Sequence, residues 1–575
     1  MSHRPRLSRR AFVSAVGTTG FVGACATSAK PGATGAAVPA PRSPAAGPYD
    51  LILRGGRIWT QDPKRPEVEA IAIRDGKVAA LGTGAALGDA ATTVVELDDR
   101  RVIPGLNDVH MHPTRGGRFF AAELRWDGVE SLERGLDMIR DQAKRTPPGQ
   151  WVRVIGGWSP YQFRERRMPT PEELTKAAPD VPVFVLFLYS GGMLNRAAVD
   201  ALGITPETPT PAGTAYEVVE GRVTGRLLAI PNPTLLYQTI GKLPPLTAEQ
   251  MAISTQHYYR DLNRFGLTSV IDAGGGGHHF PEDYGGTQAL ADRGQMPIRI
   301  SNFLFPQKKG AELEEFRRWT ANFEIGVNMA KRLDHGYVVK GGGEFLVWAA
   351  GDFENFQAPR PELDDREGWR PQLMEVTRHL LAKGWPLRIH ATYDESINNI
   401  LGVFEEADKL EREAGRPGFD GIRWAIDHGE TASLETLQRV HRMKGGLATQ
   451  CRMAYAGEDF IERYGPAMAG RAPAYGDVKK VGLPVGLGSD ATRVSSYNPW
   501  ITLYWATTGK SVGGTPLLSE EHRLSRAEAL FMHTRGSAWF SQEEKLKGTL
   551  SVGQYADLAV LSDDYFAVED EAIRR

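Results

Sequence analysis

The chain has 575 residues, of which 41% are hydrophobic and 24% are charged. Its 68 Lys and Arg residues almost balance its 70 Asp and Glu residues, for a formal net charge of −2. This composition excludes a fibrous or wholly disordered chain, and the near-neutral charge gives no reason to expect a nucleic-acid partner. No apolar run reaches the length of about 18 residues that a membrane-spanning helix needs, so we expect none in the mature protein. Two cysteines cannot form a disulfide framework.

Residues 1–25 have the pattern of an export signal. Arg9 and Arg10 precede a short apolar stretch that ends in small residues, and this stretch is too short for a membrane anchor. The paired arginines resemble a twin-arginine signal, which is a receptor-read address. The segment ending in Cys25 resembles a bacterial lipobox, and lipidation of Cys25 and plain cleavage both stay open. We therefore expect an exported protein, either periplasmic or tethered at the cell envelope by a lipid on Cys25, its only membrane contact.

The next segments predict a linker and a small β domain. Residues 26–48 are mostly Ala, Pro, Gly, Ser and Thr, a composition typical of a disordered linker. Short strands and glycine turns follow at 50–58 and 70–78, with an Asp-Gly hairpin signal at Asp75. Residues 548–561 have the same character. We predict one β-sandwich domain built from both chain ends, residues 49–103 plus 541–575.

Between residues 104 and 540, helices, single glycines and short apolar strands alternate. The predicted helices 251–265 and 371–383 lead through Gly266 and Gly384 to strands 267–272 and 385–390. The strands at 447–450 and 485–490 follow the same scheme. Glycine ends a helix by adopting a left-handed conformation, and alternating helices and apolar strands indicate parallel βαβ units. We predict an α/β fold, a (β/α)8 TIM barrel with its chemistry at the carboxyl ends of the strands.

Polar side chains at these strand ends form the candidate catalytic centre. They are His110, His112, Lys340, His390, His428 and Asp490. His110 and His112 are two positions apart in a strand, so their side chains point to the same face. Imidazoles plus one carboxylate, with room left for water, predict a catalytic rather than a structural zinc site. Each residue alone has an ordinary structural explanation, but their succession at intervals of about one βα unit favours one shared site.

These motifs resemble the metal-dependent amidohydrolase superfamily, and within it amidohydrolase family 3, the branch that contains N-substituted formamide deformylase. The resemblance extends from about residue 50 to residue 565 and rests on the segments 104–112, 427–428, 488–490 and 553–558. It implies that the four histidines and Asp490 bind one or two divalent ions, in the first place Zn²⁺. It also implies that Lys340 is carboxylated if two ions are bound, and that Asp490 moves the proton of the attacking water.

Departures from the family pattern fall where substrate would bind. Three glycines follow Lys340, Ser190 replaces a histidine found in many relatives, and Cys451 replaces a proline. These changes leave the choice between one and two metal ions open. The candidate substrate-contacting residues are His278, His279, Trp158 and Tyr393. The competing explanation is a solvated loop for the two histidines and an ordinary core position for the two aromatic residues.

The sequence therefore predicts a metal-dependent hydrolase that cuts a C–N bond other than a peptide bond in a small molecule, such as an amide, formamide or cyclic amide. A metal-bound water of lowered pKa and a carboxylate that takes its proton are sufficient for this chemistry. A metal-dependent decarboxylase, hydratase or isomerase on the same scaffold is the first alternative. A non-catalytic exported binding protein is the second, disfavoured by the joint presence of the four histidines and Asp490. A homo-oligomer stays open.

Overall fold

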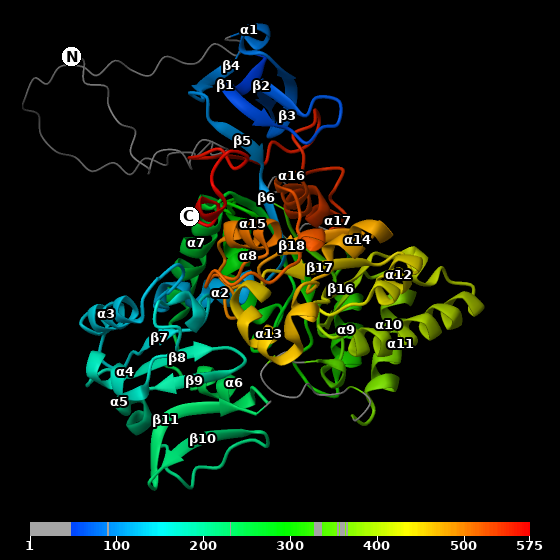
Figure 1. Cartoon of the computed structure of the whole chain (residues 1–575). Coiled ribbons are helices and arrows are strands. Elements are labelled where there is room, and N and C mark those ends of the chain that lie inside the picture. The colour runs from blue at the N-terminus through cyan, green and yellow to red at the C-terminus, as the bar shows by residue number, and fades with distance from the viewer. Residues whose placement is uncertain are drawn as a thin grey trace, which may run out of the picture. The chain divides into compact units, whose positions relative to one another are not determined.

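The computed structural model describes residues 48–88, 91–230, 232–326, 336–352, 356, 363 and 366–575 (Figure 1). The predicted export signal with Cys25, and the predicted linker except for residue 48, lie outside the described residues. Within the described ranges, no helix is both long and apolar enough to cross a membrane. The chain divides into two compact units. The first extends to Pro104 and includes Thr549–Asp563, and the second comprises Gly105–Gly548 and Asp564–Arg575.

The first unit is a mixed sheet built from both ends of the chain, as predicted. Its strands are β1 (Tyr49–Trp59), β2 (Glu67–Arg74), β3 (Lys77–Gly82), β4 (Ala91–Glu96), β5 (Arg101–Pro104) and β19 (Leu558–Val560), with a short helix α1 (Gly84–Leu87). The strand order is β19-β5-β1-β2-β3, and β4 pairs with β1. Asp75 and Gly76 form the predicted tight turn between β2 and β3, both with positive φ. Ile58, Ile71 and Leu550 belong to the core of this unit.

The second unit contains a sheet of eight parallel strands in the order β18-β17-β16-β15-β14-β13-β12-β6. Its strands are β6 (Leu106–Met111), β12 (Leu267–Asp272), β13 (Arg299–Leu304), β14 (Tyr337–Gly342), β15 (Leu387–Ala391), β16 (Trp424–His428), β17 (Gly446–Gln450) and β18 (Val485–Gly488). The first and last strands also meet, because the Asp490 amide donates to the His110 carbonyl at 2.8 Å. The predicted α/β barrel is thereby confirmed.

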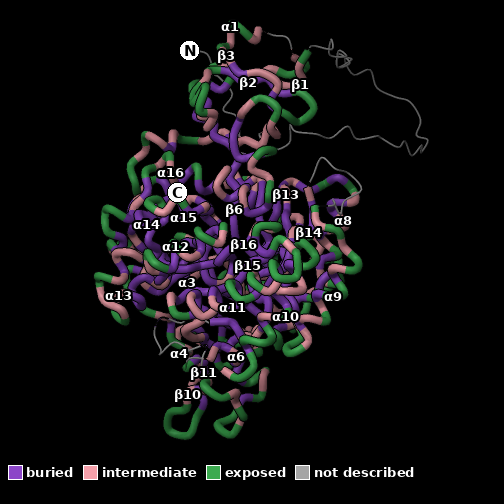
Figure 2. Tube along the Cα trace, turned by 90° about the vertical axis from the view of Figure 1, so that its right-hand side faces the viewer, coloured by how far each residue is buried: buried purple, intermediate pink, exposed green. Residues whose placement is uncertain are grey.

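Helices separate the barrel strands in the predicted manner. They are α7 (Ala248–Arg264), α8 (Gly285–Asp292), α9 (Glu312–Asn322), α10 (Trp369–Ala382), α11 (Asp394–Glu413), α12 (Leu434–Arg442), α13 (Met453–Ala469), α14 (Tyr475–Val481), α15 (Pro499–Thr508), α16 (Arg526–Phe531) and α17 (Ser537–Phe540). Gly384 and Gly482 end α10 and α14 with φ of 66° and 73°, a backbone that disfavours other residues. Each turn then leads directly into a barrel strand. Figure 2 shows β6, β15 and β16 running through the buried part of the unit.

A second sheet inside the barrel segment was not predicted. Its strands, in the order β10-β11-β9-β8-β7, are β7 (Val152–Val154), β8 (Val183–Phe187), β9 (Gly191–Leu194), β10 (Thr214–Val219) and β11 (Arg222–Ala229). The accompanying helices are α2 (Pro113–Phe119), α3 (Leu132–Ala143), α4 (Pro171–Ala177), α5 (Arg196–Ala201) and α6 (Thr234–Gly241). This insertion between β6 and α7 has hydrophobic cores of its own.

The division of the chain differs from the predicted boundaries near the C-terminus. Residues 541–548 and 564–575, which we expected in the β domain, belong to the barrel unit. The contacts of the last residues explain this placement. Tyr504 of α15 donates to Glu571 at 2.9 Å, and Arg574 donates to the Val512 carbonyl at 2.9 Å.

Candidate metal centre

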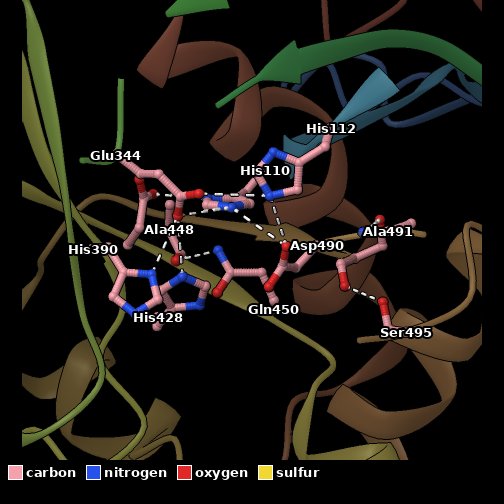
Figure 3. A network of polar contacts seen from close by, with 12 residues as sticks. His110, His112, Glu344, His390, His428, Ala448, Gln450, Asp490, Ala491 and Ser495 are labelled. Carbon is pink, nitrogen blue, oxygen red and sulfur yellow. Dashed lines mark hydrogen bonds and ion pairs between the residues drawn. The ribbon is translucent and has the colours of Figure 1, made fainter. Parts of the chain in front are cut away.

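Six buried side chains from five barrel strands or the residues just after them converge at one end of the barrel (Figure 3). They are His110 of β6, His112 directly after β6, Glu344 after β14, His390 of β15, His428 of β16 and Asp490 after β18. The structure therefore brings together every predicted ligand except Lys340. It adds Glu344, which sequence reasoning missed.

Glu344 lies between the imidazole rings. Its Oε2 atom is 3.4 Å from His110 Nε2, 3.3 Å from His390 Nδ1 and 3.4 Å from His428 Nε2, and its Oε1 atom is 3.6 Å from His112 Nε2. The Glu344 carbonyl also accepts a hydrogen bond from the His390 amide at 2.8 Å, which fixes its backbone beside β15. One carboxylate thus faces all four histidines.

Asp490 approaches the same group from the other side. Its Oδ1 atom is 3.0 Å from His112 Nε2 and 3.7 Å from His110 Nε2. Two sets of donors, His110–Glu344–His428 and His110–His112–Asp490, each have ligand atoms within 4.8 Å of one another. His110 Nε2, which belongs to both sets, is buried and forms no hydrogen bond with any described residue. Imidazole nitrogen and carboxylate oxygen are the donors that zinc accepts, so the residues fit a divalent metal ion.

The outer nitrogen of three histidines is held by a fixed partner. His110 Nδ1 lies 3.3 Å from Asp427 Oδ1. His112 Nδ1 donates to the Gly274 carbonyl at 2.5 Å, and His390 Nε2 donates to the Asp352 carbonyl at 2.8 Å. Such contacts set the tautomer and the ring orientation, and they leave the other nitrogen for a metal ion.

Asp427 is itself fixed by a buried cation. Arg388 Nε donates to Asp427 Oδ2 at 3.0 Å, and Arg388 Nη1 donates to the Val109 carbonyl at 2.7 Å. Burial opposes the ionisation of Asp427, but the charges of Arg388 and His110 hold its pKa below the ordinary value. The ionised Asp427 therefore stabilises the orientation of the His110 ring.

The carboxylates that face the histidines are also held in the ionised form. Burial opposes the ionisation of Glu344, but the charge of His110 and the hydrogen bonds with His390 and His428 hold its pKa well below the ordinary value. Burial opposes the ionisation of Asp490 as well, while the hydrogen bond with His112 and the charge of His110 lower its pKa to about 2. Both groups are therefore suited to a cation.

Asp108 joins the two strands that close the barrel. Its Oδ2 atom accepts from the Ser489 hydroxyl at 2.6 Å and from the Ser489 amide at 3.0 Å, and its Oδ1 atom accepts from the His110 amide at 3.0 Å.

Two residues of the cluster, His428 and Asp490, have positive φ angles of 79° and 59°. Non-glycine residues rarely adopt this backbone, and it clusters at functional sites.

Lys340 lies outside the cluster. Its Nζ atom is 3.3 Å from Glu543 Oε1, and Lys547 Nζ is 2.7 Å from Glu543 Oε2. Strand β14 continues two residues beyond Lys340 to Gly342, and the chain then turns so that Glu344 reaches the histidines. Glycines have no side chain that would mark the end of a strand, which is why the sequence did not single out Glu344. Carboxylation of Lys340 stays a prediction.

The four predicted substrate-contacting residues have different surroundings. His278 is buried, with its ring 5.3 Å from that of Tyr284, whereas His279 is exposed and its amide donates to Asp283 at 2.7 Å. The Tyr393 amide donates at 3.1 Å to the carboxylate of Asp352, whose carbonyl binds His390.

Trp158 belongs to the core of the inserted segment. It is 1% exposed, its ring centroid is 4.9 Å from that of Trp126, and its Nε1 atom donates to the Leu186 carbonyl at 3.0 Å. Both its apolar surface and its polar atom are thus in contact with protein. This agrees with the alternative explanation, in which Trp158 is an ordinary core residue.

The sequence profile of the amidohydrolase family, family 3, matches residues 93–575. The chain is 24% identical over 543 residues to the putative amidohydrolase YtcJ of Bacillus subtilis (strain 168). This alignment covers 90% of this chain and 95% of the relative. The chain is also 24% identical over 545 residues to N-substituted formamide deformylase of Arthrobacter pascens, with 90% and 94% covered. A crystal structure of an uncharacterized metal-dependent hydrolase from Pyrococcus horikoshii has a TM-score of 0.64 at 21% identity and covers 91% of this chain and 99% of its own. Since the profile spans most of the chain and the fold agrees, the protein belongs to the amidohydrolase family.

Proposed function

We propose that this protein is a metal-dependent hydrolase that cuts the C–N bond of a small-molecule amide, formamide or cyclic amide. The observation that carries the proposal is the convergence of four buried histidines with Glu344 and Asp490 at the carboxyl end of the barrel. In barrels of this kind, catalytic groups come from the ends of several strands. The name of the Arthrobacter relative, a deformylase of N-substituted formamides, supports a C–N bond as the target.

His110 would hold one divalent ion, together with either His428 and Glu344 or His112 and Asp490, and the remaining donors would be free to hold a second. When bound, such an ion lowers the pKa of a water molecule towards neutrality and polarises a carbonyl oxygen. Zn²⁺ fits the mixture of nitrogen and oxygen donors, as one ion or two. Asp427, Gly274 and Asp352 keep the rings of His110, His112 and His390 in place.

Asp490 would move the proton. Its Oδ1 atom lies 3.0 Å from His112 Nε2 and 3.7 Å from His110 Nε2, and a carboxylate at such a position would accept a proton from the attacking water. Returning this proton to the nitrogen of the broken bond lets the leaving group depart as a neutral amine. Water therefore supplies the new oxygen of the acid product.

Two measurements test this proposal. His390→Ala should reduce the metal content of the purified protein by elemental analysis, whereas His441→Ala on the exposed face of α12 should not. Asp490→Asn should lower kcat on an identified amide at least a hundredfold, whereas Asp141→Asn on α3 should leave kcat unchanged. Hydrolysis in ¹⁸O-labelled water must place the label in the acid product. Full turnover by Asp490→Asn, or product without label, would contradict the assignment and favour carbon-centred chemistry.

We further propose that the protein is exported, on the basis of Arg9, Arg10 and the segment ending in Cys25. Replacing both arginines by lysine should retain the protein in the cytoplasmic fraction. Mass analysis of the membrane-fraction protein should show a diacylglyceryl group on Cys25, and Cys25→Ser should release the protein. An unmodified mature N-terminus elsewhere would remove the lipoprotein proposal and leave plain export.

A further inference from the structure

Two arginines follow the strands that supply the metal centre, and a buried histidine follows the neighbouring strand β12. Arg115 is three residues after His112, Arg493 is three residues after Asp490, and His278 lies in the segment after β12. Three residues of extended chain span at most about 10–11 Å. The backbone of Arg115 is therefore no farther from that of His112 than the length of a small molecule, and the same holds for Arg493 and Asp490.

Arg115 and His278 meet beside His112. A Cβ atom placed on Gly275 would lie 3.1 Å from Arg115 Nη1, 3.1 Å from His112 Nδ1 and 3.2 Å from His278 Cε1. The guanidinium, the ring of His278 and the predicted metal ligand thus surround one point. Burial holds the pKa of His278 well below its ordinary value, and the positive charge of Arg115 is the next largest cause.

Arg493 lies against aromatic rings contributed by the inserted segment. Its guanidinium carbon is 5.4 Å from the ring centroid of Tyr237 on α6, and the rings of Tyr237 and Tyr189 are 6.3 Å apart. Arg452, which follows β17, lies 5.2 Å from the ring of Tyr189. Burial lowers the pKa of Arg493 to about 10, and the charge of Arg115 acts in the same direction. Arg493 and Arg452 thus both lie against this pair of tyrosines.

These groups lack the carboxylate partners that other arginines of this unit have. Arg388 pairs with Asp427, and Arg125 pairs with Asp127 at 3.0 Å. Arg115 and Arg493 form no ion pair with any residue that the structure describes. Arg115 Nε is buried without a hydrogen-bond partner in the described residues, and so are both ring nitrogens of His278, which is 2% exposed. Burying unsatisfied polar groups costs free energy unless a ligand supplies the partner.

We propose that Arg115 and Arg493 bind a carboxylate group of the substrate, with His278 as an additional hydrogen-bond donor. This inference rests on the proposed function and narrows it to amides that carry a carboxylate within a few bonds of the scissile C–N bond. Guanidinium forks match carboxylate geometry, and such charge-assisted bonds are stronger than neutral ones. Glu344 and Asp490 contact the four histidines, and neither forms an ion pair with Arg115 or Arg493 among the described residues.

A binding experiment on the full-length purified protein with its metal tests the anion site directly. Hydrocinnamate and hydrocinnamyl alcohol have the same skeleton and differ in the carboxylate. We expect hydrocinnamate to bind at least about tenfold more tightly by calorimetry, from one charge-assisted contact. Arg493→Met and Arg115→Met should each lose most of this preference. Arg493→Lys, which keeps the charge but not the fork, should lose part of it, and Arg134→Met on the exposed face of α3 should retain it.

Turnover of a second pair separates this inference from the proposed function. N-acetylphenylalanine, in both enantiomers, and N-acetylphenethylamine present the same amide with and without a carboxylate. We expect a ratio of kcat/KM of at least about ten in favour of the acid, carried by KM, and a ratio near one in Arg115→Met/Arg493→Met. Equal binding of the two hydrocinnamyl probes, or an unchanged preference in the arginine variants, would overturn the inference. A binding preference without hydrolysis of any amide would instead contradict the proposed function.

Discussion

Replacing Glu344 by Gln removes the negative charge that faces all four histidines and keeps the size of the side chain. The carboxylate oxygens lie 3.3–3.6 Å from nitrogens of His110, His112, His390 and His428. Loss of a residue that only supports a ligand weakens metal binding about 10- to 100-fold. Loss of Glu344, which would itself be a ligand, should exceed the upper value, a cost of more than about 2.7 kcal/mol.

Lys340→Met is the matched comparison, because the sequence predicted Lys340 as a metal ligand, whereas the structure places Glu344 among the histidines. In Lys340→Met, Glu543 keeps Lys547 at 2.7 Å, so we expect a stability loss of about 1–3 kcal/mol and unchanged metal content. The assay is metal stoichiometry by elemental analysis, followed by competition with a chelator, with and without added bicarbonate. Full metal content in Glu344→Gln together with metal loss in Lys340→Met would refute the assignment of Glu344 and support carboxylation of Lys340.

Three further changes test other parts of the site and fold. Asp427→Asn should weaken metal binding about 10- to 100-fold, measured by chelator competition, because it removes the charge that orients His110. Burial lowers the pKa of His533 to about 4 from 6.5, so the stability that depends on its neutral form is complete above pH 6.5 and falls as the pH drops towards 4. The total loss is about 3 kcal/mol, and His533→Gln should flatten this part of the Tm–pH curve. Trp158→Ala should destabilise the fold by about 3–5 kcal/mol in denaturant titration, as for a core residue, and an unchanged midpoint would contradict this.

Much of the barrel could be predicted from local sequence, because its helices end at glycines and its strands are short apolar runs. Strands β12, β15, β16, β17 and β18 lie where the sequence placed them, within a few residues. Strand β13 was not predicted, although Gly294 follows α8 with a φ of 63°, because Arg299–Leu304 carries no candidate catalytic side chain that would have singled it out. Its assignment depends on pairing with β12 and β14.

The inserted sheet and Glu344 depend even more on tertiary contacts. Strands β7 to β11 pair with one another in a separate sheet, and a repeat of barrel units does not predict this pairing. The register between β13 and β14 shifts between Asn302 and Phe303, so counting along the strand could not decide whether Lys340 or Glu344 reaches the centre. His110, His112, His390 and His428 were easier to predict, because each lies on a strand, or directly after one, whose end the sequence marks.

Hydrogen bonds across the seam between β6 and β18 hold together residues that adjoin the metal centre. Asp108 of β6 accepts hydrogen bonds across this seam from the hydroxyl and amide of Ser489, and it also accepts one from the His110 amide within β6. Because Asp490 directly follows Ser489, these bonds fix the spacing of Asp490 from the histidines of β6. Asp108→Ala should therefore weaken metal binding about 10- to 100-fold, as expected for a residue that only supports the ligands. Ser489→Ala removes the hydroxyl bond to Asp108 and the bond accepted from the Ala491 amide, but it keeps the bond from the Ser489 amide, so it should have the smaller effect. Wild-type metal affinity in a folded Asp108→Ala protein would show instead that the ion gathers its own ligands, in which case metal binding and barrel closure should be coupled.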